Sequence, residues 1–168
     1  SKYNTLVAEV TENLDKYELG LAVQKLYDFI WDIFCDWYIE IAKARLNGED
    51  ENAKNTARSV LVYVFTNTLA LLHPFMPFIT EEIWLSMPHN GEALMVTQWP
   101  KFAEELKFVS EEADFEKIMD VIKAIRNRRA EMNVPPSKKA KVQIATSNKE
   151  AFSMGTAYIC RLGFASEV

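Results

Sequence analysis

The sequence is poor in the residues that build loops, disulfide frameworks and metal sites. Only 5 of its 168 residues are glycine, which argues against a loop-rich β sandwich with its many turns. The two cysteines, Cys35 and Cys160, form neither a metal-ligand spacing nor a disulfide framework, and they suit a reducing, cytoplasmic location. No apolar run approaches the roughly 18 residues of a membrane span. The N-terminus shows no signal-peptide pattern, so no membrane partner is expected.

Motifs that would carry chemistry are also missing. There is no glycine-rich phosphate loop, no His or Cys pair with metal-ligand spacing and no plausible catalytic triad. His73 has no nucleophile or carboxylate beside it in the sequence, so we assign it to a helix end. Glu81 and Glu82 are interpreted as first-turn residues of a helix that Thr80 caps. The chain is therefore not expected to be an enzyme by itself or to bind a cofactor or metal.

Helical patterns dominate what is present. The chain is 49% apolar and 12% aromatic, a composition that excludes disorder. Apolar residues recurring with a period near 3.6 predict a long helix over residues 19–46 and a second one over 53–72. Trp99 is expected to fold back onto these helices as an anchor. The buried stripe of the first helix is expected to comprise Leu19, Val23, Leu26, Ile30, Phe34, Trp37, Ile41 and Ala44.

The C-terminal third changes pattern. A helix is predicted from Ser110, as its N-cap, to about Met132, before two prolines that stop it. Alternation of apolar and polar residues then predicts a strand over 141–146. A helix over 147–162 and a second strand over 164–168 are predicted to follow. The predicted fold is mainly α, with a helical bundle over 1–136 and a small C-terminal β-α-β appendage over 137–168. We expect the appendage to pack on the bundle or to be completed by further residues, because it cannot cover its own sheet.

A basic cluster stands at the junction of these two parts. It comprises Lys123, Arg126, Arg128, Arg129, Lys138, Lys139 and Lys141, interrupted by the single acid Glu131. The chain as a whole has a net charge of -5, so this local excess predicts a polyanionic partner. The alternative is a solvated face, and part of the charge also matches the helix dipole. Arg129 is expected to turn inward and pair with an acidic helix.

A second candidate set lies on the outer face of the long predicted helix. Trp31 and Tyr38 lie beside its apolar stripe, together with Lys43 and Arg45. Aromatic rings stack on unpaired bases while cations neutralise phosphates, so this set suits single-stranded RNA. The alternative is that both rings pack against a neighbouring helix, as large aromatics usually do. A protein-interaction module is therefore the rival of a nucleic-acid-binding module.

Three runs of residues resemble one enzyme family. The runs over 26–40 and 73–84 resemble the anticodon-binding helical domain of class I aminoacyl-tRNA synthetases, in particular the valine, isoleucine and leucine enzymes. The run from Arg129 to Lys139, Arg-Ala-Glu-Met-Asn-Val-Pro-Pro-Ser-Lys-Lys, narrows the resemblance to the valyl-tRNA synthetases. The runs occur in the family's order and cover nearly the whole chain.

The resemblance implies a function for the residues already singled out. The parent enzyme would join valine to tRNA(Val) with ATP and Mg²⁺, using catalytic and editing domains that lie upstream of this piece. Trp31, Tyr38, Lys43 and Arg45 would then meet the anticodon loop, and Arg126, Arg128, Lys138 and Lys139 would hold the stem backbone. Two alternatives stay open: a docking module for its own enzyme without RNA binding, and the equivalent domain of an isoleucyl- or leucyl-tRNA synthetase. The piece itself is expected to be monomeric.

Overall fold

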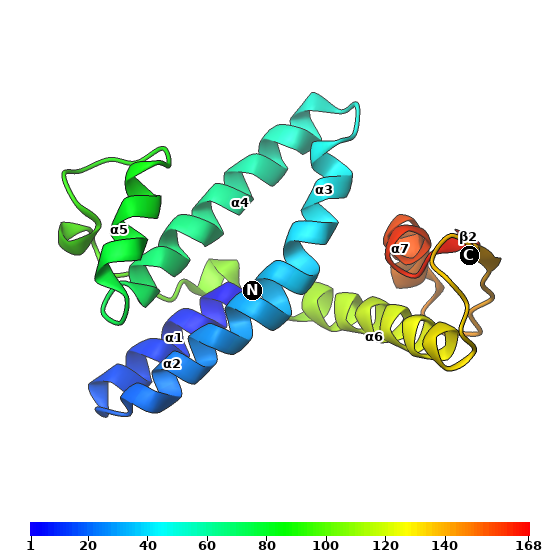
Figure 1. Ribbon diagram of the computed structural model, residues 1–168, viewed down its shortest axis with the longest axis horizontal. Helices are drawn as coiled ribbons and strands as arrows, with labels where there is room; N and C mark the ends of the chain where they lie inside the picture. Colours follow the sequence, from blue (N-terminus) through cyan, green and yellow to red (C-terminus); the bar gives the residue numbers. More distant parts are fainter. The chain divides into compact units, whose positions relative to one another are not determined.

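The structure is a computed structural model that describes residues 1–168 (Figure 1). The chain forms two compact units, residues 1–107 and residues 108–168. The first is entirely helical, and the second combines two helices with a pair of short strands. The predicted mainly α fold with a small β-α-β part is confirmed. The predicted boundary at residue 136 falls inside the second unit, because the helix before it packs against the helix after it.

The first unit is a set of antiparallel helices joined by short turns. Helix α1 lies along α2, α4 returns beside α3, and α5 follows α4 (Figure 1). Short 3-10 turns at Leu94–Val96 and Glu104–Leu106 lie in the segment that follows α5. The longer elements are α1 (Lys2–Asp15), α2 (Leu19–Asp28), η1 (Phe29–Ile39), α3 (Glu40–Leu46), α4 (Glu51–Leu72) and α5 (Pro77–Leu85).

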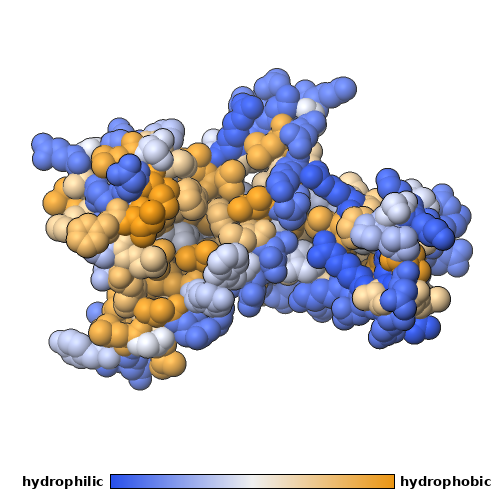
Figure 2. All heavy atoms as spheres, viewed as in Figure 1, coloured by the Kyte–Doolittle hydropathy of each residue, from blue (hydrophilic) through white to orange (hydrophobic).

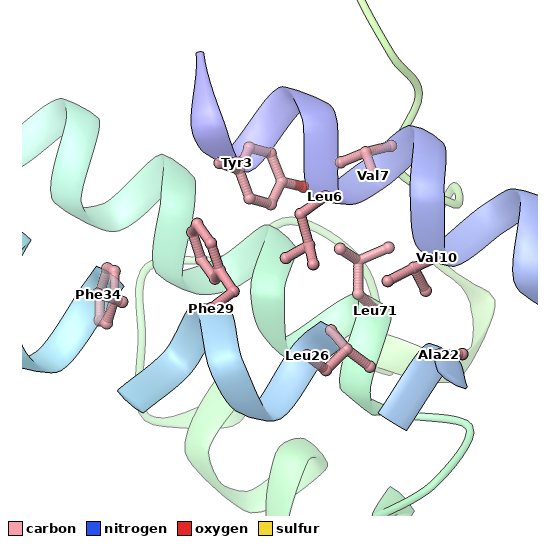
Figure 3. Close-up of a cluster of buried hydrophobic side chains, with 9 residues drawn as sticks. All are labelled: Tyr3, Leu6, Val7, Val10, Ala22, Leu26, Phe29, Phe34 and Leu71. Carbon is pink, nitrogen blue, oxygen red and sulfur yellow. The ribbon is translucent and has the colours of Figure 1, made fainter. Parts of the chain in front are cut away.

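The core of this unit forms where α1, α2, η1 and α4 meet (Figure 3). Leu26 and Leu71 are fully buried, and Phe34 stacks on Phe65 with ring centroids 5.9 Å apart. Trp99 packs against the same cluster, and its Nε1 donates a hydrogen bond of 2.9 Å to Oγ1 of Thr11. The expected anchoring role of Trp99 is therefore confirmed. The cluster comprises Tyr3, Leu6, Val7, Val10, Ala22, Leu26, Phe29, Phe34 and Leu71.

The long helix over 19–46 is present, but its middle is not an α-helix. Element η1 is a π-helix, in which backbone bonds run from residue i to i+5, so the phase of the buried face changes along the element. Ala22 and Leu26 are buried on α2, whereas Leu19 and Val23 are exposed. The predicted stripe was therefore wrong for Leu19 and Val23, because the buried face of α2 carries Ala22 and Leu26 and leaves both of these residues on the exposed side.

The start of α5 also differs from the prediction. The helix begins at Pro77, so Thr80 lies inside it and is not its N-cap. The buried Thr80 hydroxyl donates to the carbonyl of Met76 at 2.8 Å and also forms a hydrogen bond of 2.8 Å with Nδ1 of His73. Proline is favoured in the first turn because its missing N–H would be unsatisfied there anyway. The Glu81 carboxylate accepts the backbone N–H of Leu94 and so fixes the following loop.

The second unit is built on α6 (Val109–Glu131). It continues through strand β1 (Ala140–Lys141), α7 (Lys149–Leu162) and strand β2 (Ala165–Glu167), with the two strands parallel. The N-cap of α6 is Phe108, so the prediction of Ser110 in that role was wrong. The Ser110 hydroxyl instead donates a hydrogen bond to the Glu111 carboxylate. The β-α-β part packs on α6 through α7, as its need for a covering surface predicted.

A glycine permits the close approach of α6 and α7. A Cβ atom at Gly155 would lie 2.5 Å from Cδ1 of Ile118 and 2.8 Å from its Cγ1. Ordinary carbon contacts are roughly 3.5–4.0 Å. Nearby, Phe115 and Tyr158 pack edge to face, with ring centroids 5.7 Å apart. The two helices therefore pack at a distance that only a residue without a side chain allows.

Candidate nucleic-acid interface

The eight predicted site residues form two sets, one in each compact unit. In the first unit, Lys43 and Arg45 lie in the last turn of α3, and both are exposed. Cations suit a helix C-terminus because the macrodipole is negative there. Lys43 forms an exposed ion pair with Glu40, one turn earlier. Such pairs contribute little to stability, so the lysine can exchange its carboxylate for a phosphate at small cost.

Trp31 offers an open aromatic surface on η1. It is 54% exposed and lies beside Tyr27, which sequence reasoning missed, with ring centroids 6.2 Å apart. Asp28 and Asp32 are both exposed on the same stretch of helix. Carboxylates repel phosphates, so the surroundings of Trp31 favour stacking of a ring more than binding of a backbone.

Tyr38 occupies a different environment from Trp31. Its ring stacks on Phe34 with centroids 5.8 Å apart, and it packs against the core cluster of the first unit. Burial raises the pKa of the Tyr38 phenol above its ordinary value, and the nearby Arg45 guanidinium partly opposes that change. At least one face of this ring is therefore committed to protein packing.

In the second unit, Arg126 and Arg128 have distinct surroundings. Nε of Arg126 donates a 2.8 Å hydrogen bond to the carbonyl of Leu162, which links α6 to the last turn of α7. Arg128 is exposed and pairs with Glu131 at 3.0 Å. Arg126 therefore has a structural task in this unit, whereas the guanidinium of Arg128 faces solvent.

The turn after α6 is shaped by its backbone and by one arginine. Asn133 adopts a left-handed conformation with φ of 52°. The N–H groups of Val134 and Asn133 return to the carbonyls of Arg129 and Ala130, which is the Schellman arrangement. The helix thus ends at Met132 through this motif, before the prolines expected to stop it. Asn tolerates the left-handed region better than most residues, which explains its position.

Arg129 bonds to the backbone of this turn. Its Nη2 donates to the carbonyl of Pro135 at 2.8 Å and also to that of Lys138. Its guanidinium carbon lies 5.8 Å from the centroid of the Phe164 ring. The expectation that Arg129 turns inward is confirmed, but the expected acidic partner was wrong. Its partners are two backbone carbonyls and a ring, contacts that sequence spacing does not reveal.

Lys138 and Lys139 lie at the end of the turn that Arg129 holds. Both are exposed, and neither makes an ion pair in the structure. Lys141, by contrast, pairs with Glu167 at 2.5 Å across the two strands, and Lys123 pairs with Asp120. Within the basic cluster, Lys138 and Lys139 are therefore the cations available for an external anion without breaking an internal pair.

No three His, Cys, Asp or Glu side chains come together in a way that would hold a metal ion. None of the helices has the length and apolar character needed to cross a bilayer.

Comparison with known proteins identifies relatives of the whole chain. The sequence profile of the family described as "Anticodon-binding domain of tRNA ligase" matches residues 1–144. A valine–tRNA ligase of Clostridium acetobutylicum is 53% identical over 170 residues, covering 100% of this chain, and one of Clostridium tetani is 50% identical over 169 residues. One of Bacillus cereus is 49% identical over 156 residues, or 93% of the chain. The chain spans about 19% of the length of the two clostridial relatives and about 18% of the Bacillus one.

Proposed function

The chain belongs to the family of anticodon-binding domains of tRNA ligases, and from this premise we propose that it is the tRNA-binding part of a valine–tRNA ligase. The names and the high identity of its relatives support valine over isoleucine or leucine. The whole enzyme joins valine to tRNA(Val) with ATP and Mg²⁺ in the cytoplasm. That chemistry takes place in a catalytic domain outside these residues, and an editing domain also lies elsewhere. This chain contributes binding and positioning, as a monomer.

The observation that carries the proposal is the pair of unpaired, exposed lysines at the end of the turn after α6. Lys138 and Lys139 present positive charge on a protein whose net charge is -5. Neutralising phosphates releases counterions, which favours binding strongly at low salt. Arg128 adds a third cation after giving up its exposed pair with Glu131. These three residues hold the RNA backbone.

The first unit supplies a second contact. Lys43 and Arg45 neutralise phosphates at the end of α3, and the exposed ring of Trp31 stacks on an unpaired base. Stacking on an aromatic ring contributes roughly 1–3 kcal/mol per base. Arg126 and Tyr38 support the interface through packing, because the carbonyl of Leu162 and the ring of Phe34 already occupy them.

The test is a fluorescence-anisotropy titration of this chain with the anticodon stem-loop of tRNA(Val), at low and at physiological salt. A stem-loop with a scrambled anticodon measures specificity. The variant Lys138→Ala/Lys139→Ala is compared with the matched control Lys101→Ala/Lys149→Ala, which removes the same charge from exposed lysines elsewhere. We expect the first variant to reduce the slope of log K against log salt by about 2, or about 1 per phosphate contact.

The outcomes separate the parts of the proposal. Tighter binding of the cognate stem-loop at both salts supports anticodon recognition within these residues. Equal binding of both stem-loops, lost in salt and in the Lys138→Ala/Lys139→Ala variant, supports backbone contact only. Absence of binding even at low salt contradicts RNA binding by this chain.

A second candidate function is docking onto another domain of the same enzyme. The observation that favours it is an exposed apolar row on α2 and η1: Leu19, Val23, Tyr27 and Trp31 are all 41–57% exposed. Apolar side chains also reach the surface around α5 (Figure 2). Contiguous exposed apolar surface marks interaction sites. Leu19→Glu is expected to weaken binding of this chain to the separately expressed catalytic domain, whereas Gly20→Ala leaves it unchanged.

A further inference from the structure

An open apolar pocket of about 490 Å³ lies within the second unit. It lies between the C-terminal half of α6, the turn after it, residues 140 and 142 at β1, and residues 163 and 164 just before β2. Its walls include Ile125, Met132, Val134, Val142 and Phe164, and their exposed surface is almost entirely apolar. The volume falls within the range of roughly 300–1,000 Å³ that is usual for ligand pockets. Of the three cations of this unit proposed to hold phosphates, only Arg128 lines this space.

The border of the pocket is positively charged. Arg128 and Arg129 both line it, and Arg129 also binds the carbonyl of Lys138. The turn with the exposed Lys138 and Lys139 therefore adjoins the pocket. Glu131, the acid of this segment, is occupied by Arg128. A ligand that fits must present an apolar surface to the walls and negative charge to the border.

Phe164 gives the pocket an aromatic wall at a cost to the backbone. Its φ is 55°, in the left-handed region that bulky residues rarely adopt. Glycine would take this conformation without strain. The guanidinium carbon of Arg129 lies over this ring, 5.8 Å from its centroid. A rigid ring and a held guanidinium plane are the two surfaces on which unstacked nucleobases are commonly stacked.

We infer that this pocket takes one unstacked nucleobase of the bound RNA, while Arg128, Lys138 and Lys139 hold the phosphates on either side of it. The inference rests on the proposed function, because it assumes that the anionic ligand is RNA. A nucleotide within RNA combines a flat base, whose faces are apolar, with a charged phosphate on its 5′ and its 3′ side, which matches the walls and the border. Few polar groups face the pocket, so it accepts a base by stacking and does not read its hydrogen-bonding edge.

The test uses this 168-residue chain and tRNA(Val) transcripts in which each unpaired position in turn carries 2-aminopurine or an abasic spacer. We expect one position at which 2-aminopurine fluorescence changes on binding. The spacer there is expected to weaken binding roughly 5- to 100-fold, the equivalent of one lost stacking contact. Spacers elsewhere in the same loop serve as controls.

Two variants connect that position to the pocket. Ala140 lines the pocket and is exposed, so Ala140→Phe fills the space without entering the core. Met132→Ala removes an exposed wall. Both variants are expected to abolish the fluorescence change. With either variant, the abasic spacer at that position is expected no longer to weaken binding of the transcript. The control Ala157→Phe places the same bulk on an exposed position of α7 outside the pocket lining, and is expected to keep both effects.

The failures are distinguishable. If wild-type protein binds no transcript, the proposed function fails and this inference with it. If the transcript binds, and Lys138→Ala/Lys139→Ala weakens it, but Ala140→Phe changes neither fluorescence nor affinity, the lysines hold RNA and the pocket does not. The nucleobase inference is then overturned.

Discussion

Gly155→Ala tests whether a glycine sets the distance between α6 and α7. The new methyl carbon would lie 2.5 Å from Cδ1 and 2.8 Å from Cγ1 of Ile118, well inside contact distance. Ile118 is buried and, as a β-branched residue in a helix, has essentially one χ1 rotamer, so it cannot simply rotate away. Overpacking of this kind costs about 1–3 kcal/mol. Alanine returns about 1 kcal/mol of helix propensity, which leaves a net destabilisation of up to about 2 kcal/mol.

Hydrogen exchange followed by mass spectrometry is the suitable assay. All four tryptophans lie in residues 1–107, so tryptophan fluorescence does not report on the second unit. We expect the slowest amides of α6 and α7 to exchange up to about 30-fold faster in the variant. The control is Gly20→Ala on α2, where an added Cβ meets nothing within 4 Å. That change is expected to stabilise by about 0.4–1 kcal/mol through the unfolded state.

A double-mutant cycle supplies the refutation. Ile118→Ala removes all three atoms that the new methyl group would meet. In that background Gly155→Ala is expected to change sign and stabilise by about 1 kcal/mol, because only the propensity gain remains. If Gly155→Ala alone stabilises as Gly20→Ala does, or costs the same with and without Ile118, close approach is not the reason for this glycine.

Three further predictions concern single groups. The Tyr3 hydroxyl is buried without a partner and burial raises its pKa, so Tyr3→Phe is expected to be neutral or slightly stabilising at pH 7. The stability of the wild-type protein falls as the pH rises above about 10, because the unfolded chain ionises its tyrosine more readily. The urea midpoint of Tyr3→Phe should therefore exceed that of the wild type by more at high pH. Hydrogen bonds from Lys117, and then from Asn148, lower the pKa of Asp114. The resulting stability is present above the ordinary carboxyl pKa and is lost as the pH falls, so the urea-midpoint deficit of Asp114→Asn should shrink from pH 7 to pH 3. Asn133→Val is expected to cost about 1–2 kcal/mol in urea unfolding followed by circular dichroism, because a β-branched residue must take a left-handed conformation, whereas Asn133→Gly should not.

Helices were predictable here wherever one periodic signal decided them. The helix over 53–72 follows from local pattern, because apolar stripes and proline stops act within a few residues. The exposure of Leu19 and Val23 was not predictable, since the contacts of α2 with α1 and α4 decide which face of α2 is buried. Thr80 also resembles an N-cap in sequence, and only its bonds with His73 and Met76 reveal its position inside a helix.

The candidate site was predictable in composition but not in geometry. Charge counting alone found Lys138 and Lys139, which the structure leaves exposed and unpaired. It did not separate them from Arg126, because only the carbonyl of Leu162, 36 residues later, distinguishes a structural arginine from an available one. The pocket beside them is equally invisible in the sequence, since its walls come from three separate segments.

The bonds made by Arg129 leave the sequence of the turn largely free. They reach the backbone carbonyls of Pro135 and Lys138, groups that every amino acid possesses. Substitutions at residues 136, 138 and 139 therefore change what the turn presents to a ligand while the arginine preserves its shape. The side chains at these positions can therefore vary, by evolution or by design, without a change in the backbone conformation of the turn.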